Sequence, residues 1–354
     1  MTSSRSSTPQ ANPATCPARM TQRVVAKSMG ITQATVSLAL RNDPRIPEAR
    51  RREIKRTAER LGYQPSSAGS ALAQMRHSSS SKPLHATLAW INFWKIPKDL
   101  RKHREFGSYF DGAVEAAQKF GYRVEEFFCS DKLSPQRLHN ILTSRGIDAL
   151  LLPPHRQNPD WTNFDWNPFS VIKFGQSLRE PVCHMVSPDQ LANAHLGIRA
   201  MQELGYARIG YVGYDDHYRL FDAGVLKAQS SLPDESRIPL LRLTGTQPRC
   251  QQQKLAAWLQ RFRPDAILTD FKGLLDLLEQ HGYRVPEDIG LASTTVLDGD
   301  VTAGIDQYPK EIGRVGVLSL LSLIQDHERG LPELSREILI QGSWRNGPSL
   351  PKRP

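Results

Sequence analysis

Apolar residues recur at helical spacing in residues 22–41, QRVVAKSMGITQATVSLALR, and predict two short helices joined by a tight turn. Gly30 ends the first helix, because a residue without Cβ suits a sharp turn. Thr32 is the expected N-cap of the second helix, since its hydroxyl accepts a hydrogen bond from an orphan N–H. The expected buried faces consist of Val24, Val25, Ala26 and Met29, then Val36, Ala39 and Leu40. This arrangement is a helix-turn-helix.

A third helix is predicted to open at Pro47, a residue that suits the first turn of a helix. Its expected buried stripe is formed by Ile54, Ala58 and Leu61. Residues 63–65 then break the pattern, because a proline holds the preceding residue extended. Residues 66–76 predict a short fourth helix. It is marginal on its own, because Gly69 costs about 1 kcal/mol relative to alanine.

A second pattern follows the serine-rich linker at 77–83, where apolar runs alternate with amphipathic stretches. Strands are expected at 86–93, 123–128, 148–152, 169–174, 208–213, 239–243, 265–269 and 288–292. Helices are expected at 108–120, 134–145, 189–204, 217–229, 249–262, 271–281 and 309–325. Strict alternation predicts parallel sheets with helices on both faces. Such sheets bind ligands outside the carboxyl ends of their strands, and the remaining length suffices for two lobes.

Charge is concentrated beside the helix-turn-helix. Residues 1–76 hold 13 Lys and Arg against 4 Asp and Glu, a net charge of +9, whereas the whole chain carries +10. An ordinary helical hairpin of a globular core is the alternative reading of the helix pattern. The clustered positive charge favours a domain that binds a polyanion. Short side chains on the open face of the second helix suit base edges and phosphates. They are Gln33, Ala34, Thr35 and Ser37.

Other functional classes find little support in the sequence. The chain has no apolar run of the length that spans a bilayer, and its N-terminus lacks the apolar core of a signal peptide. The cysteines Cys16, Cys129, Cys183 and Cys250 form no CxxC pair, which favours a reducing cytoplasm over a zinc or disulfide framework. Nucleotide-binding, zinc-protease and serine-hydrolase motifs are absent, and the histidines are scattered. We therefore expect no enzyme, no catalytic residue, no metal and no cofactor.

The stretch from about Thr21 to Met75, including the Leu-Gly-Tyr-x-Pro junction, resembles the headpiece and hinge of LacI-type (lactose- and purine-repressor) regulators. The resemblance implies a dimer on a near-palindromic DNA operator, with a hinge helix whose leucine wedges into the minor groove. The implied DNA-binding residues are Thr21, Thr32, Gln33, Ala34, Thr35, Ser37, Asn42 and Leu72. Leu38 stands where many members have arginine, so their base preference does not transfer. Packing against the third helix is the alternative role for Leu38.

The second half resembles the effector domain of the same family, a two-lobed α/β fold similar to periplasmic sugar-binding proteins. The resemblance implies that polar strand ends hold a sugar or related metabolite between the lobes. The implied effector residues are Trp90, Trp94, Asp189, Arg219, Asp270 and Gln307. Four of these residues have a stated alternative role: Asp189 as a helix cap, Arg219 as a surface ion-pair partner, and the two tryptophans as core or lobe-interface residues.

One departure from the family bears on the effector. Residues 292–296, ASTTV, replace a segment in which sugar-responsive members carry an aspartate, and Asp298 or Asp300 is left as a candidate substitute. The aromatic segment 161–169 is expected either to roof the cleft or to pack at a lobe edge. The C-terminal residues carry no leucine heptad, which favours a homodimer over a tetramer.

The expected organisation has four parts. Residues 1–18 form a disordered tail, 19–64 the headpiece, 65–82 the hinge helix and linker, and 83–354 the effector-binding and dimerisation domain. The expected protein is a cytoplasmic DNA-binding transcriptional repressor under the control of a small molecule. A ligand-independent repressor and an architectural DNA-binding protein are the alternatives.

Overall fold

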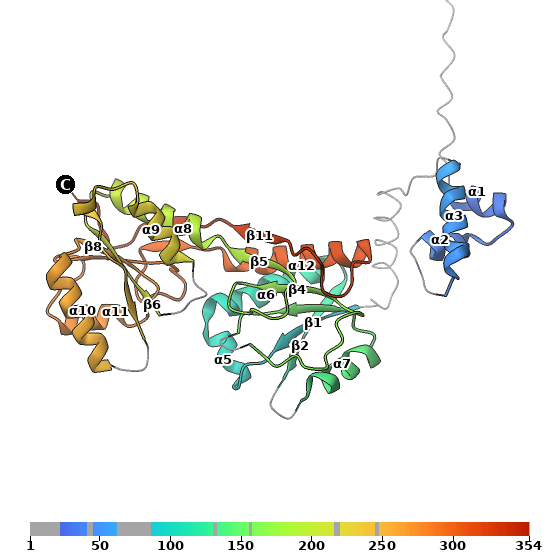
Figure 1. Cartoon of the computed structure of the whole chain (residues 1–354), viewed down its shortest axis with the longest axis horizontal. Coiled ribbons are helices and arrows are strands. Elements are labelled where there is room, and N and C mark those ends of the chain that lie inside the picture. The colour runs from blue at the N-terminus through green and yellow to red at the C-terminus, as the bar shows by residue number, and fades with distance from the viewer. Residues whose placement is uncertain are drawn as a thin grey trace, which may run out of the picture. The chain divides into compact units, whose positions relative to one another are not determined.

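The computed structural model describes residues 22–40, 45–61, 86–129, 133–155, 158–215, 220–244 and 248–353. The chain separates into two compact units, Met1–Pro83 and Leu84–Pro354. Figure 1 shows a small helical unit and a larger unit of sheets and helices. No helix among these residues is both long and apolar enough to cross a membrane.

The small unit holds three helices, α1 (Gln22–Met29), α2 (Gln33–Leu40) and α3 (Glu48–Arg60). Gly30 adopts φ +63° in the turn between α1 and α2, a conformation that side chains with Cβ rarely adopt. The core of this unit consists of Val25, Ala26, Val36, Ala39, Ile54 and Ala58. The predicted helix-turn-helix and its buried stripe are confirmed, except that Val24 is 43% exposed.

The first sheet of the large unit has six strands in the order β11-β5-β4-β3-β1-β2. All of its strand pairs are parallel. The strands are β1 (Ala86–Asn92), β2 (Tyr122–Phe128), β3 (Ala149–Leu152), β4 (Ser170–Phe174), β5 (His184–Pro188) and β11 (Glu337–Ile340). The helices of this lobe are α5 (Pro97–Lys102), α6 (Arg104–Lys119), α7 (Pro135–Ser144) and α12 (Pro309–Asp326).

The second sheet also has six strands, in the order β12-β10-β9-β8-β6-β7. They are β6 (Ile209–Tyr214), β7 (Leu241–Leu243), β8 (Ala266–Thr269), β9 (Gly290–Ser293), β10 (Gly304–Asp306) and β12 (Ser343–Arg345). The helices are α8 (Gln190–Glu203), α9 (Phe221–Gln229), α10 (Pro248–Phe262) and α11 (Leu274–Gln280), with a 3-10 turn at Asp234–Ser236. We refer to the sheets with their helices as the first and second lobes.

Central strands of each sheet, such as β3 and β8, are buried along their whole length and are therefore apolar throughout rather than alternating. In β1, Leu88 and Trp90 belong to the core on one face of the sheet, and Ala89 and Ile91 to the core on the other. The second lobe repeats the arrangement with its own pair of cores. Helices α6 and α12 approach closely, since a Cβ on Gly112 would lie 1.9 Å from the carbonyl oxygen of Lys310.

The chain passes between the lobes three times, from β5 to α8, from β10 to α12 and from β11 to β12. Hydrogen bonds tie these crossings together. The N–H of Asp189 donates to the carbonyl of Ile340 at 2.9 Å, and the N–H of Gly342 donates to Oδ1 of Asn193 at 2.8 Å. Three adjacent crossings bring the carboxyl ends of the strands of both lobes toward one region.

The predicted two-lobed α/β class is confirmed, but the expectation of strictly alternating, parallel elements is wrong in detail. Strand β12 pairs antiparallel with β10. Five short elements, α5, β5, β10, β11 and β12, were absent from the sequence prediction. They escaped it because they are three to six residues long, too short for a period to show. Strand β5 in addition contains His184, Ser187 and Pro188, which are poor strand formers by sequence.

Candidate functional site

The start of α2 presents a polar face. The N–H of Thr35 donates to Oγ1 of Thr32 at 3.1 Å, which confirms the predicted N-cap. Gln33 and Ala34 are exposed, and Thr35 and Ser37 are half-buried. The opposite side of the helix is fixed, because Val36 and Ala39 are fully buried in the core. The polar face is therefore held by packing and capping rather than by contacts of its own.

Leu38 is half-buried on this helix. The partly buried apolar residues that pack against the core of the small unit are Met29, Ile31, Leu40, Ile46 and Leu61. Leu38 is not among these, and its packing against the third helix remains a prediction. It lies four residues after Ala34 and therefore on the same side of the helix.

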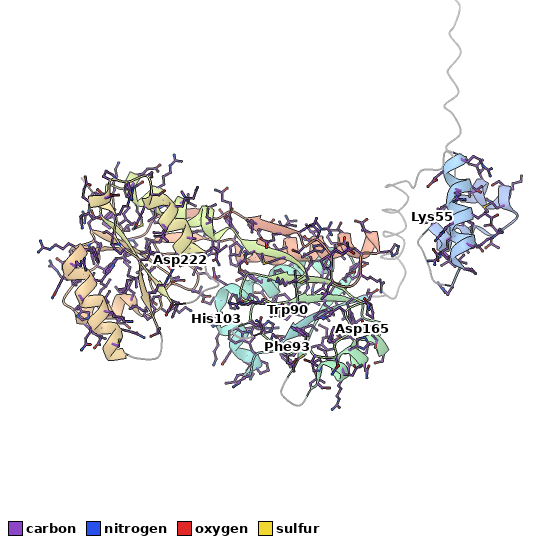
Figure 2. The ribbon with its side chains drawn as sticks, viewed as in Figure 1. Lys55, Trp90, Phe93, His103, Asp165 and Asp222 are labelled. Atoms are coloured by element: carbon purple, nitrogen blue, oxygen red, sulfur yellow. The ribbon has the colours of Figure 1, made fainter. Side chains whose placement is uncertain are left out.

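The two other helices of the small unit carry basic side chains. Arg23 and Lys27 are exposed on α1, and Lys55, labelled in Figure 2, is half-buried on α3. Two arginines of α3 are engaged locally, since Arg50 pairs with Glu53 at 2.6 Å and Arg52 pairs with Glu48. Exposed pairs of this kind contribute little to stability, so the positive charge of the unit remains available to a polyanion.

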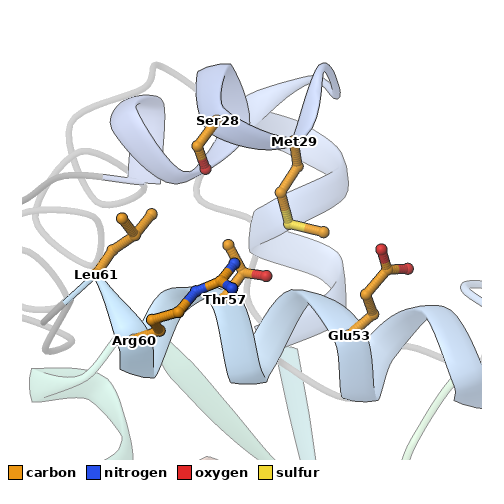
Figure 3. Close-up of a pocket in the computed structure, with 6 residues that line it drawn as sticks. All are labelled: Ser28, Met29, Glu53, Thr57, Arg60 and Leu61. Atoms are coloured by element: carbon orange, nitrogen blue, oxygen red, sulfur yellow. The ribbon is translucent and has the colours of Figure 1, made fainter.

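A small hollow of about 230 Å³ lies between α1 and α3 (Figure 3). Its lining residues are Ser28, Met29, Glu53, Thr57, Arg60 and Leu61. The lining mixes one acid, one base and short polar groups. It therefore offers no set of convergent donors or acceptors for a particular ligand.

In the large unit, Trp90 lies within the core of the first lobe (Figure 2). It is fully buried, with ring centroids 5.3 Å from Phe110 and 5.4 Å from Phe174. Its side chain is therefore enclosed by the protein core, as the core alternative predicts.

Trp94 lies just beyond the end of β1, where the cleft is expected. Its Nε1 donates to the carbonyl of Pro154 at 2.9 Å, and its ring lies 5.4 Å from that of His103. The neighbouring Phe93 donates its backbone N–H to Nε2 of His155 at 3.0 Å. Burial lowers the pKa of His155 to about 4, so this imidazole is neutral and accepts that bond.

Three predicted effector residues occupy strand ends or crossings. Oδ1 of Asp270 accepts the N–H of Tyr214 at 3.1 Å, and Nε2 of Gln307 donates to the carbonyl of Thr294 at 2.7 Å. Both side chains are buried. Asp189 caps α8 by accepting the N–H of Ala192 at 2.9 Å, which is its structural alternative, and it remains half-exposed.

Sequence reasoning missed a set of contacts between the lobes. Asp298, in the loop after β9, accepts the N–H groups of Arg104 and Glu105 at 3.0 Å each, at the start of α6. Thr295 donates its hydroxyl to the carboxylate of Glu105. Asp300, by contrast, accepts the N–H of Gly273 within its own lobe at 2.6 Å. Both candidate substitutes for the missing family aspartate are thus engaged with backbone amides.

Four predicted site residues, Thr21, Asn42, Leu72 and Arg219, lie outside the described residues. Within the described part of the chain, no three His, Cys, Asp or Glu side chains gather as a metal site. Burial raises the pKa of the Cys129 and Cys183 thiols to about 12, so both stay protonated and behave as small apolar residues.

Comparison with known proteins bears on this arrangement. Residues 23–66 match the model of the bacterial regulatory proteins of the lacI family. The HTH-type transcriptional repressor CytR of Escherichia coli (strain K12) is 25% identical over 348 residues, which cover 92% of this chain and 96% of CytR. The chain therefore resembles LacI-family repressors along nearly its whole length, and residues 23–66 carry the family's DNA-binding domain. It is a DNA-binding transcriptional regulator, and the match places its DNA-binding domain on the three helices of the small unit.

Solved structures agree with this LacI-type assignment at the level of the fold. The CelR–cellobiose complex aligns with a TM-score of 0.56 at 16% identity, covering 94% of this chain and 100% of that one. The lac repressor dimer bound to operator and the anti-inducer ONPF aligns with a TM-score of 0.53 at 15% identity, covering 94% and 99%. A LacI-family regulator from Chloroflexus aggregans aligns with a TM-score of 0.55 at 18% identity, covering 75% and 99%.

The aromatic segment 161–169 packs within the first lobe of this LacI-type chain. Trp161 lies 4.8 Å from Phe93 and 4.8 Å from Trp166, between ring centroids, and Phe164 and Phe169 belong to the core on that face of the sheet. Of the two predicted roles for the segment, packing is the one these contacts support.

Proposed function

We propose that this LacI-type regulator binds a near-palindromic operator as a homodimer and represses transcription, with a small-molecule effector between the lobes that sets its DNA affinity. The observation that carries the proposal is the polar, exposed start of α2, capped by Thr32, in a unit whose other helices carry exposed basic side chains. The repressor function of CytR and the operator-bound lac repressor dimer support it.

The proposed division of labour on DNA follows from side-chain chemistry. Gln33 and Ala34 contact base edges, while Thr32, Thr35 and Ser37 bond phosphates or bases. By the family resemblance, Thr21 and Asn42 contact the duplex beside them. Leu72 partly unstacks the central base step and kinks the operator, so that both headpieces reach their half-sites.

The proposed effector is a sugar or a related polar metabolite. CelR is bound to cellobiose, and a LacI-family regulator from Enterococcus faecium to ribose. The residues proposed to hold the effector are Trp94, Asp189, Arg219, Asp270 and Gln307, with Trp90 supporting the first lobe from its core. The guanidinium of Arg219 is suited to two parallel hydrogen bonds with adjacent hydroxyls or a carboxylate.

We further propose that the protein acts in the cytoplasm, without enzymatic activity, metal or cofactor. The proposed parts are the tail 1–18, the headpiece 19–64, the hinge and linker 65–82 and the effector domain 83–354. The two compact units, which meet at Pro83 and Leu84, support the last of these boundaries.

Operator binding is tested by selecting duplexes from a random pool with the full-length protein and sedimenting the complex. The proposal predicts a near-palindromic consensus bound by two chains. Leu72→Ala is expected to weaken binding to the selected operator by a few kcal/mol, while binding to non-specific DNA stays nearly unchanged. Selection of no consensus, with coating of any duplex, would instead favour an architectural protein.

Effector binding is tested by thermal shift of the full-length protein against sugars, sugar acids and nucleobases. A compound at a hundredfold excess over its Kd stabilises the folded protein by about 2.7 kcal/mol. Arg219→Ala is expected to lower the affinity for that compound by about 2–3 kcal/mol in calorimetry. Arg199→Ala is a matched control, because Arg199 is exposed on α8 and pairs with Glu203. If no compound binds, or if none changes operator affinity, the regulator is ligand-independent.

A further inference from the structure

Helix α2 carries no charged residue in its eight positions, QATVSLAL. Val36 and Ala39 are fully buried, and Gln33 and Ala34 are exposed. Leu38 is half-buried on the side of Ala34. The helix thus offers one amide, short hydroxyls and an apolar pair, but neither a guanidinium nor an ammonium.

These groups differ in the bases that they suit. Guanine offers two acceptors in the major groove, which arginine or lysine reads, whereas adenine pairs with an amide and the thymine methyl with apolar side chains. We propose that α2 reads A·T pairs, with Gln33 on an adenine and Ala34 and Leu38 on thymine methyl groups. This inference rests on the proposed operator binding. Arg23 and Lys27 on α1 then serve the phosphates, which carry no sequence information.

The test uses the operator selected by the full-length protein. We expect A·T pairs at the positions that α2 contacts, and replacement of each thymine there by deoxyuridine is expected to weaken binding about fourfold, the factor for one buried methyl group. Gln33→Ala is expected to lose discrimination of about 5- to 150-fold at one adenine. Leu38→Arg is expected to select a guanine in each half-site.

Lys27→Ala is the control, because loss of a phosphate contact weakens all sequences alike. Conserved G·C pairs at the α2 positions, or deoxyuridine substitutions without effect, would overturn the A·T inference while leaving operator binding intact. Absence of any selected operator would overturn the proposed function itself.

A second, independent inference concerns the start of α6. The residue before this helix, His103, makes no side-chain capping hydrogen bond, whereas α7 and α8 are capped by Ser134 and Asp189 next to them. The orphan N–H groups of Arg104 and Glu105 are bonded by Asp298 of the other lobe. A carboxylate there also complements the positive end of the helix dipole.

The Asp298 side chain is only 8% exposed, and Lys272 of its own lobe lies 3.5 Å from its carboxylate. Thr295 adds a second bridge, to the carboxylate of Glu105. We infer that residues 295–298 form a latch that ties the second lobe to the start of α6 in the first lobe. An effector that regulates this protein then acts by releasing this latch, a consequence that rests on the proposed function.

The latch is tested on the full-length protein without DNA or added small molecule. Hydrogen exchange at the amides of Arg104 and Glu105 is expected to be slow. Asp298→Ala is expected to raise both exchange rates about fivefold or more, the factor for loss of a typical cap. Thr295→Val is expected to raise them too, although Asp298 is retained, because the lobes then separate more often. Asp300→Ala, which loses a bond within the second lobe, is the control.

Lobe separation is measured directly between spin labels at Gln136→Cys on α7 and Lys254→Cys on α10, both exposed positions, in excess unlabelled protein. If the latch holds the lobes together, the distance between the two spin labels should be short and uniform in the otherwise unchanged protein. In Asp298→Ala this distance should shift to longer values. Faster exchange with an unchanged distance would mean that Asp298 is only a cap, and would overturn the latch. Since no DNA is present, this outcome is independent of operator binding.

Discussion

The two units of this regulator each contain a helix whose N-terminus is capped, α2 in the headpiece and α6 in the effector unit, and the two caps have opposite origins. Helix α2 of the headpiece is capped by Thr32, three residues before the amide that it bonds. Helix α6 of the effector unit is capped by Asp298, 193 residues after Glu105. The first cap leaves the face of its helix open, whereas the second covers the helix start with the protein's own carboxylate. The start of α2 is therefore shaped by local structure, whereas the start of α6 depends on a contact from the other lobe.

The two units also differ in the size of their hydrophobic cores and therefore in their expected stability. The buried core of the headpiece is six apolar residues from three short helices. The effector unit has four larger cores, two for each sheet. Small domains bury a smaller fraction of their surface and are more easily unfolded. Changes in the headpiece core should therefore abolish DNA binding without affecting the effector unit.

The largest expected effect is that of Ile54→Ala. Ile54 is fully buried in the headpiece, and its truncation costs about 2–5 kcal/mol, comparable to the stability of a small domain. We expect operator binding to be lost in gel-shift titrations while the thermal transition of the effector unit is unchanged. Glu59→Ala, an exposed change on the same helix, should preserve binding. A shift of both transitions would show that the units do not unfold independently.

The next expected effect is a pH dependence of stability that is confined to the effector unit. Burial lowers the pKa of His155 from 6.5 to about 4, so between these values the unfolded chain binds the proton and the folded chain does not. The stability contributed by neutral His155 is therefore present above pH 6.5 and decreases as the pH falls toward 4. The expected loss from pH 7 to pH 5 is about 2 kcal/mol.

Urea unfolding of the parent protein and of His155→Gln at both pH values measures this contribution. The variant should lose less stability than the parent on acidification, and the effect should appear in the effector unit alone. Equal losses in the two proteins would show that His155 does not remain neutral in the folded chain.

The smallest expected effect tests the local cap. Thr32→Ala removes the hydroxyl that accepts the N–H of Thr35 and should destabilise the headpiece by about 1 kcal/mol. Thr32→Ser retains a hydroxyl and should restore most of the loss in thermal unfolding of the headpiece. Failure of the serine variant to do so would mean that the methyl group, rather than the cap, carries the effect.

The sequence was informative where structure is local. The turn at Gly30 and the cap at Thr32 were predicted because each depends on residues within a few positions. Strands such as β3 and β8 were predicted because apolar runs suit a sheet buried on both faces. Strands β11 and β12 were missed, since runs of four and three residues are too short to show a period.

The candidate site residues also divide into those fixed by local sequence and those fixed by contacts distant in the chain. The exposure of Gln33 and Ala34 and the burial of Val36 and Ala39 agree with the prediction, because helical spacing decides which side of α2 faces the core. The roles of Asp298 and Thr295 could not be predicted, since they bond to a helix almost 200 residues earlier in the chain. The burial of Trp90 depended equally on Phe110 and Phe174, whose spacing in sequence says nothing of their contact.

The salt dependence of operator binding tests the central claim most directly. Two headpieces that each neutralise several phosphates release the corresponding counterions on binding. With a net charge of +9 in residues 1–76, the slope of log K against log salt concentration should be more negative than about −5 for the dimer. A slope near zero, or binding of a single chain in sedimentation, would contradict a dimeric DNA-binding regulator.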